Sequence, residues 1–114
     1  GAAAGHGTYL GPEDFTIITV LKNDLTKAAN FAVPVSGDSM EPKFHDGDIL
    51  LVGDEIPGVD DIGIFTMDGK GYVKKMGENE LVSLNPAYDP IPMDDSIINN
   101  GKVIGVLEPE MIVK

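Results

Sequence analysis

The sequence contains no cysteine and no tryptophan, and basic residues are scarce. Without cysteine the chain cannot form a disulfide, a thiol nucleophile or a thiolate metal site. The absence also suits a reducing compartment, so we expect the protein to be cytoplasmic. Eight basic residues face nineteen acidic ones, for a formal net charge of −11. Because phosphate groups repel so acidic a domain, we do not expect it to bind DNA or an anionic membrane by itself.

Long apolar runs are missing as well. No segment approaches the roughly 18 consecutive apolar residues that a membrane span requires, and no signal-peptide pattern is present, so we expect no membrane partner. Paired acidic residues occur at Asp60-Asp61 and Asp94-Asp95, but not at the spacing of a calcium-binding loop. They are expected to be solvated acidic loops, and the sequence predicts neither a metal nor a cofactor.

Glycine and proline, in contrast, are frequent, with 14 and 8 among 114 residues. This composition favours one mostly β domain: a small, twisted antiparallel sheet that forms a partly open barrel. One short helical turn is expected at residues 40–45. The expected strands are 15–21, 31–35, 49–52, 62–67, 71–76, 81–84, 102–107 and 111–113. The expected turns are 23–24, 45–47, 57–58, 68–69, 77–79 and 99–101, of which Asp68-Gly69 is a hairpin signal.

The first residues differ from the rest in being small and rich in glycine. We predict that residues 1–11 form a mobile arm ahead of a folded domain at 12–114. The chain begins at Gly1 without an initiator methionine. We therefore expect a fragment of a longer protein, with another domain upstream and Gly1 as a cloning remnant.

Residues 35–42, with the sequence VSGDSMEP, form the most informative motif. A glycine followed by an exposed serine, Ser39, between two apolar strands is how a chain presents a nucleophilic hydroxyl at a strand end. Such a serine needs a base, an oxyanion site and a substrate. The alternative is a turn serine that bonds only to the local backbone.

Histidine is a poor candidate for the base. His6 lies in the predicted arm and His45 lies in an acidic turn beside Asp46, so both are expected to be solvated. The sequence also has no G-x-S-x-G motif.

Lysine is the better candidate, because burial among apolar groups lowers the pKa of its amine and lets the neutral form act as a base. In the predicted strand 71–76, Lys74 shares a face with Tyr72 and Met76 and is expected to be buried. Lys75 points to the other face and is expected to be solvated. The alternative is that both lysines decorate an edge strand.

Together these segments resemble a known family. Residues 35–42 and 46–52, followed by 72–76, are similar to the C-terminal domain of LexA-like and phage-type transcriptional repressors, which are Ser–Lys autopeptidases with a signal-peptidase-like fold. Residues 84–91 and 101–107 resemble the later strands of that family. The match covers nearly the whole chain, with the motifs in the family's order. Ser39 and Lys74 are 35 residues apart, which is close to the family's usual separation.

The resemblance implies a role for each matching residue. Ser39 would be the nucleophile, Lys74 the general base, and the backbone amides of Asp38 and Ser39 the oxyanion site. The family's substrate is an Ala-Gly or Cys-Gly bond upstream in the same chain. Here Ala4-Gly5 lies 34 residues before Ser39.

The resemblance also implies partners and regulation. We expect a homodimer formed through this domain and operator DNA bound only by the missing N-terminal domain. A RecA filament on single-stranded DNA would favour docking of the arm. Self-cleavage would then inactivate a bacterial or prophage repressor, as in the SOS response.

Three other readings remain open. Residues 37–42 also resemble the serine motif of signal peptidase I, although the chain shows neither its membrane anchor nor its later Gly-Asp-Asn segment. A polymerase accessory protein of the UmuD type would share the fold and the chemistry. A dimerisation and sensing module that no longer cleaves is the third possibility.

Overall fold

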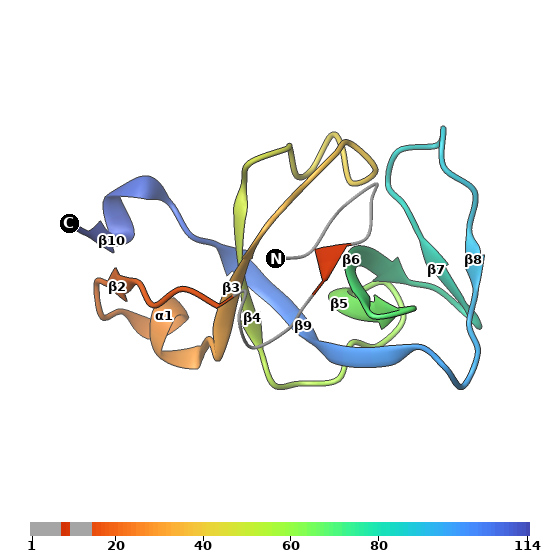
Figure 1. The fold of residues 1–114 in the computed structure, drawn as a ribbon, viewed down its shortest axis with the longest axis horizontal. Coiled ribbons are helices and arrows are strands. Elements are labelled where there is room, and N and C mark those ends of the chain that lie inside the picture. The colour runs from red at the N-terminus through yellow and green to blue at the C-terminus, as the bar shows by residue number, and fades with distance from the viewer. Residues whose placement is uncertain (1–7, 10–14) are drawn as a thin grey trace.

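The computed structural model describes residues 8–9 and 15–114, and their structure is mostly β. Strands β2 and β10 and helix α1 lie at one end of the molecule, and β7 and β8 lie at the other (Figure 1). In chain order the elements are β1 (Thr8–Tyr9), β2 (Thr19–Val20), α1 (Asp24–Ala28), β3 (Phe31–Pro34), β4 (Ile49–Gly53), β5 (Ile62–Met67), β6 (Lys70–Met76), β7 (Glu80–Val82), β8 (Ile91–Pro92), β9 (Ile98–Val106), the 3-10 helix η2 (Pro109–Met111) and β10 (Ile112–Val113).

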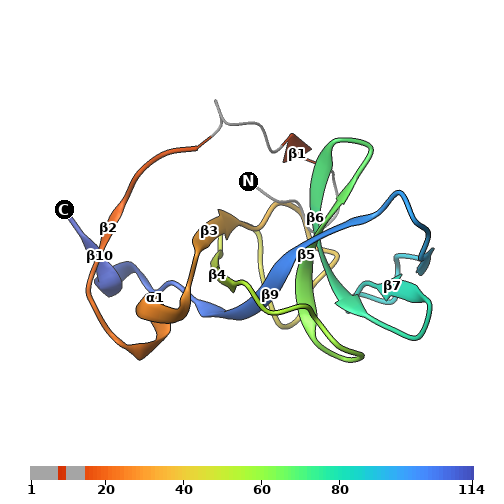
Figure 2. The ribbon, with the colours of Figure 1, turned by 90° about the horizontal axis from the view of Figure 1, so that it is seen from below.

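One antiparallel sheet forms the body of the domain. Its strand order is β3-β4-β9-β5-β6-β7-β8, and β1 pairs with β6 outside this path. Figure 2 shows the long strand β9 joining the β3–β4 side to the β5–β6 side. Within the described part of the chain the sheet does not close into a barrel, because β3 and β8 lie at opposite ends of the order. The predicted mostly β, antiparallel fold is confirmed.

The edge of β6 that faces away from β5 is shared between two strands. Strand β1 pairs with its first two residues, Lys70 and Gly71, and β7 pairs with its last two, Lys75 and Met76. The stretch 72–74, which contains Lys74, therefore lies between the two partners.

The predicted hairpin at Asp68-Gly69 is confirmed. Both residues have positive φ, 52° and 78°, as a two-residue type I′ turn requires. The turn closes the Met67–Lys70 pair, and the β5–β6 ladder that follows runs to Ile62 and Lys75.

The segment before α1 differs from its prediction. Only Thr19–Val20 of the expected strand 15–21 is a strand, and it pairs with β10 over two residue pairs alone. Phe15 and Ile17 are exposed. An apolar segment that has no longer partner strand cannot pair its backbone N–H and C=O groups in a β ladder. The β structure is therefore limited to Thr19–Val20.

Helix α1 was not predicted, because Asn23-Asp24 was interpreted as a turn. Asn23 is in fact the N-cap: its Oδ1 accepts from the Thr26 N–H at 2.8 Å, and the Thr26 Oγ1 accepts from the Asn23 N–H at 2.9 Å. These two reciprocal bonds form a capping box, which starts a short helix at this position.

The predicted turn at residues 99–101 is also wrong, because these residues lie within β9. Gly101 has a φ of 135°, and the β5–β9 register shifts between Ile64 and Phe65, opposite this point. The Gly101 N–H donates to the Asn99 Oδ1 at 2.9 Å. The turn-like residues therefore form a β-bulge that bends the strand without ending it. Strand β8, which carries Pro92 at the edge of the sheet, was not predicted either.

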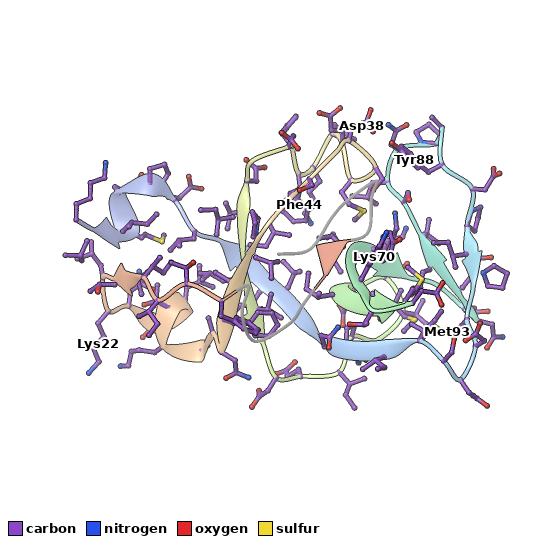
Figure 3. The ribbon with its side chains drawn as sticks, viewed as in Figure 1. Lys22, Asp38, Phe44, Lys70, Tyr88 and Met93 are labelled. Atoms are coloured by element: carbon purple, nitrogen blue, oxygen red, sulfur yellow. The ribbon has the colours of Figure 1, made fainter. Side chains whose placement is uncertain are left out.

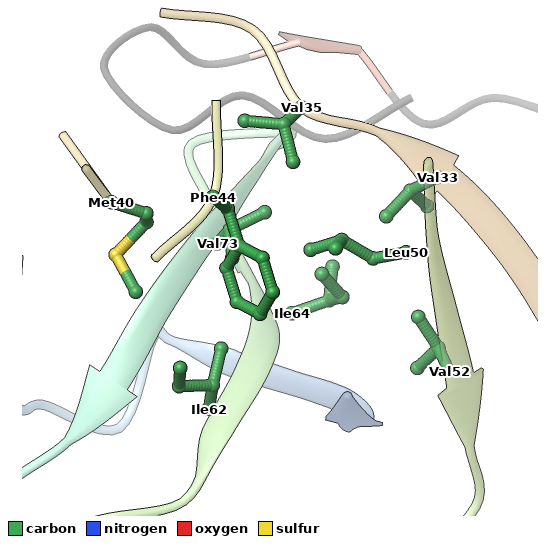
Figure 4. Close-up of a cluster of buried hydrophobic side chains, with 9 residues drawn as sticks. All are labelled: Val33, Val35, Met40, Phe44, Leu50, Val52, Ile62, Ile64 and Val73. Atoms are coloured by element: carbon green, nitrogen blue, oxygen red, sulfur yellow. The ribbon is translucent and has the colours of Figure 1, made fainter. Parts of the chain in front are cut away.

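The hydrophobic core lies between the β3–β4 and β5–β6 strands and the loop that joins β3 to β4. Figure 4 shows the side chains of Met40 and Phe44 from this loop directed at the same cluster as the strand residues. The cluster comprises Val33, Val35, Met40, Phe44, Leu50, Val52, Ile62, Ile64 and Val73. The loop that carries Ser39 is thus part of the core.

Candidate active site

Two buried apolar side chains anchor the turn that carries Ser39. Met40 and Phe44 are four residues apart and buried, and the Phe44 N–H donates to the Met40 carbonyl at 3.0 Å. The segment is a turn that contains the cis Glu41–Pro42 peptide, and not the helical turn predicted at 40–45. Because both side chains are buried, they hold the turn against the sheet and keep Ser39 beside β6.

Backbone hydrogen bonds also hold the two ends of this loop together. The Val35 N–H donates to the Asp48 carbonyl at 2.7 Å, and the Gly47 N–H donates to the Val35 carbonyl at 2.8 Å. Inside the loop, the Gly37 N–H donates to the Asp46 Oδ1 at 2.8 Å. Gly37 has a φ of 87°, a conformation that a residue without Cβ adopts at little cost.

Lys74 projects from β6 toward this turn. Its Nζ lies 3.1 Å from the Ser39 Oγ, and its side chain is 3% exposed. Directly across the β5–β6 ladder from Lys74 is Gly63. The predicted burial of Lys74 is confirmed. The neighbouring Lys75 is one-third exposed, with its Nζ 3.9 Å from the Asp60 Oδ1.

Ser39 itself is buried rather than exposed, at 0%, and here the sequence prediction is wrong. Two neighbours explain its burial. Met40 draws the turn into the core, and the Asn85 N–H donates to the Ser39 carbonyl at 2.9 Å, which brings the segment after β7 against the turn.

The environment of Lys74 favours its neutral form. Burial lowers the pKa of the amine from 10.5 to about 8, because desolvation penalises the charged state. The ring centroids of Tyr72 and Tyr88 lie 6.0 and 5.7 Å from the Nζ. These aromatic faces attract a cation and so partly stabilise the ammonium form.

Ser83 is a further residue of the site, which was not predicted from the sequence. The Lys74 Nζ lies 2.9 Å from the Ser83 Oγ, and Ser83 is buried. The last β6–β7 pair is Lys75–Val82, so Ser83 directly follows the end of this ladder and lies next to Lys74. A hairpin register drawn across the turn at 77–79 would have revealed this neighbour.

The Asp38–Ser39 peptide, the predicted oxyanion site, is held by the loop after β7. The Asn85 Nδ2 donates to the Asp38 carbonyl at 3.2 Å, and the Tyr88 hydroxyl donates to the Asp38 Oδ1 at 2.5 Å. Figure 3 shows Asp38 and Tyr88 side by side. The hydrogen bond to Asp38 is the main cause of the raised pKa of Tyr88.

The other candidate residues lie elsewhere. Ala4, Gly5 and His6 are outside the described residues. The side chain of His45 is 62% exposed, and its Nδ1 lies 4.0 Å from the Asp48 Oδ2. Within 15–114 no three acidic or histidine side chains gather as a metal site would require. No helix in the described part of the chain is long and apolar enough to cross a membrane.

The sequence of the chain also matches the model of a known family. The sequence model described as "Peptidase S24-like" matches residues 1–107. The chain belongs to the peptidase S24-like family. The predicted resemblance to the C-terminal domain of LexA-like repressors is thereby confirmed, and the fold is that of a LexA-type β domain with the architecture of a serine peptidase.

Curated relatives of this chain are LexA repressors. The LexA repressor of Mycobacterium tuberculosis is 33% identical over 114 residues, covering 94% of this chain and 48% of the relative. That of Streptomyces coelicolor is 34% identical with the same coverage. That of Mycobacterium leprae is 37% identical over 83 residues, covering 68% of this chain and 35% of the relative. The chain thus spans half or less of the length of these relatives.

Proposed function

We propose that this chain is the self-cleaving domain of a LexA-like repressor, in which Ser39 and Lys74 hydrolyse the Ala4–Gly5 bond. The observation that carries the proposal is the buried Lys74 amine, 3.1 Å from the Ser39 Oγ, with a pKa of about 8. Membership of a peptidase family and similarity to proteins named LexA repressor support the same reading.

In the first step, the neutral amine of Lys74 removes the hydroxyl proton of Ser39. The Ser39 Oγ forms a bond to the Ala4 carbonyl carbon, and the carbonyl oxygen becomes an oxyanion. The backbone amides of Asp38 and Ser39 would stabilise this charge. A lysine with a lowered pKa can act as the general base here, because a general base works best when its pKa lies near the pH of the reaction.

In the second step, the bond between the Ala4 carbonyl carbon and the Gly5 nitrogen breaks. The ammonium of Lys74 returns its proton to the departing Gly5 amine, and Ser39 stays esterified with Ala4. Water then attacks the ester while Lys74 takes its proton. The bond between the Ser39 Oγ and the Ala4 carbonyl carbon breaks, and Lys74 returns the proton to the Ser39 Oγ. The products are a fragment that ends in the Ala4 carboxylate and a chain that starts at Gly5. Because the substrate is tethered, docking avoids the entropy cost of a bimolecular encounter.

The register of β1 supports Ala4–Gly5 as the bond that is cut. The pairs Thr8–Gly71 and Tyr9–Lys70 are antiparallel, so each step back along the arm is one step forward along β6. An arm that docked in this register would bring Gly5 opposite Lys74. An extended backbone of small residues approaches a nucleophile closely, which suits alanine and glycine at this bond.

Regulation would then depend on how often the arm is docked. If the docked form is a minor population, the observed rate falls by that fraction. We propose that a RecA filament on single-stranded DNA raises this population, giving SOS-type inactivation of a bacterial or prophage repressor. Homodimerisation through this domain and operator binding by another part of the repressor belong to the same proposal.

The test is to hold the purified chain at pH 9 and follow its intact mass over hours. We expect loss of the tetrapeptide 1–4. The loss should be abolished in Ser39→Ala and in Lys74→Ala, and retained in Lys75→Ala, which makes the same change at the adjacent, partly exposed lysine.

Each other outcome points to a different reading. A stable mass in the parent chain would favour a dimerisation module that does not cleave. Loss from Ser39→Ala at the parent rate would mean a contaminating protease. Acceleration by an activated RecA filament would support a LexA-like or UmuD-like protein over a signal-peptidase-like enzyme, for which no such response is expected.

A further inference from the structure

We propose that Asn85 is a positioning residue that fixes the oxyanion site by holding both peptide units that flank Ser39. This inference rests on the proposed function and adds to it a residue with no direct part in proton transfer. Its side chain donates to the Asp38 carbonyl at 3.2 Å, and its backbone N–H donates to the Ser39 carbonyl at 2.9 Å.

The peptide plane links the first of these bonds to the oxyanion site. The Asp38 carbonyl and the Ser39 N–H belong to one planar unit and point in opposite directions across it. A donor that fixes the carbonyl therefore also fixes the direction of the N–H. The Glu41 N–H donates to the same carbonyl at 3.2 Å. With Asn85 it supplies two donors, one for each lone pair of the oxygen.

The second bond acts on the following peptide unit. The Ser39 carbonyl and the Met40 N–H share that plane, and the Asn85 N–H holds its carbonyl end. The side chain of Met40 is fully buried on the other side of the turn. The backbone of Ser39 is therefore restrained from both directions.

The carboxamide of Asn85 is itself oriented. Its Oδ1 accepts from the Ala87 N–H at 2.9 Å, and its carbonyl accepts from the Tyr88 N–H at 3.2 Å. Because Oδ1 is used inside the loop, Nδ2 is the atom that faces Asp38. Prearranged donors stabilise a developing oxyanion because they do not have to reorient during the reaction.

The experiment compares pH–rate profiles of cleavage for the parent chain, Asn85→Ala and Asn85→Asp. Asn85→Ala removes the Nδ2 donor and keeps the backbone N–H. Loss of a whole oxyanion donor typically lowers the reaction rate by a factor of about 10²–10³. Loosening one donor should therefore lower the plateau that the cleavage rate reaches at high pH by about tenfold to a hundredfold. The acid limb of the profile, which reports Lys74, should keep its midpoint in Asn85→Ala.

Asn85→Asp is the second variant, since it has the same shape and keeps the bond to the Ala87 N–H. It replaces the donor with a carboxylate oxygen facing the Asp38 carbonyl, so its plateau should fall at least as far. The matched control is Asn23→Asp, the same chemical change at the N-cap of α1, where the Oδ1 acceptor is retained. Its plateau should equal that of the parent.

Several outcomes would overturn the inference. One is a folded Asn85→Ala with the parent plateau, and another is a retained plateau with a displaced acid limb, which would mean that Asn85 acts through Lys74. If Asn85→Ala lacks a cooperative melting transition, the inference is tested by the plateau of the cleavage rate of Asn85→Asp. Loss of the transition in both variants would make the role structural. Failure of the proposed function is distinguishable, because then the parent and Asn23→Asp would also stay intact.

Discussion

The Nζ of Lys74 lies 2.9 Å from the Oγ of Ser83 and 3.1 Å from the Oγ of Ser39, so one amine bridges two hydroxyls. A neutral amine has one lone pair and two N–H donors. If the Ser83 oxygen accepts an N–H, the lone pair remains available for the hydroxyl proton of Ser39. Ser83 thus sets the rotation of the amine about its last bond.

Replacing Ser83 with alanine should therefore change two features of cleavage. The plateau should fall about tenfold, because the lone pair is no longer directed at Ser39. The acid limb should move to lower pH, because the ammonium loses a hydrogen-bond acceptor and its pKa falls. Intact-mass kinetics between pH 6 and 10 measure both effects. Ser83→Thr keeps the hydroxyl and should stay near the parent on both counts. An unchanged midpoint and plateau in Ser83→Ala would contradict the assignment.

The parent reaction should accelerate with pH. In the proposed mechanism Lys74 acts as a neutral base. With a pKa of about 8, roughly one amine in ten is neutral at pH 7 and nine in ten at pH 9. We expect the cleavage rate to rise about tenfold over this interval and then level off. Lys75→Ala should give the same profile. A rate that falls as pH rises would show that Lys74 is needed in its charged form.

Burial of Lys74 should also cost stability. Its folded-state pKa lies below 10.5, so the unfolded chain binds more protons between about pH 8 and 10.5. In this window the Lys74 contribution makes the protein more stable as pH rises, and below it the full penalty applies.

Lys74→Met should therefore be more stable than the parent at pH 7, by about 1–3 kcal/mol after allowing for the two hydrogen bonds that are lost. The difference should shrink above pH 10. Urea unfolding of both proteins at pH 7 and 10 measures it. A destabilised Lys74→Met at pH 7 would mean that the bonds to Ser39 and Ser83 outweigh the desolvation cost.

The register of β1 makes a prediction about the arm. One glycine inserted between Gly7 and Thr8 would bring His6 opposite Lys74 in place of Gly5 and reverse the faces of the residues before it. Cleavage at Ala4–Gly5 should fall at least tenfold, since even small misplacement of reacting groups is costly. A glycine inserted between Pro12 and Glu13 leaves the pairing of β1 unchanged and serves as the control. Mass spectrometry of the products identifies the bond that is cut, and equal rates in both insertions would contradict the register.

The sequence predicted the parts of the site that depend on side-chain type and local pattern. Ser39 follows a glycine turn, and the alternation of side chains in β6 was enough to choose Lys74 over Lys75. Their separation in the chain matched a known family. The structure brings the two side chains together as expected, within 3.1 Å.

The features that were not predicted from the sequence depend on strand register and on helix capping. Ser83 lies next to Lys74 only because the β6–β7 hairpin ends at Lys75–Val82, and Asn85 acts through its backbone as much as through its side chain. Helix α1 depends on a capping box in which threonine stands where glutamate is usual. Burial of Ser39 could not be predicted, because it needs the contact from the segment after β7.

The shared edge of β6 limits what can reach the dyad. Strand β1 pairs with β6 up to Gly71, and pairing of β6 with β7 begins at Lys75. An incoming peptide in the β1 register can therefore add three residues before β7 blocks further pairing, and the third of these is Gly5. Under the proposed function, a docked arm would leave the sheet between Gly5 and Ala4. The edge thus leaves a fixed length open to pairing, and under the proposed function that length would place the Ala4–Gly5 bond beside Ser39.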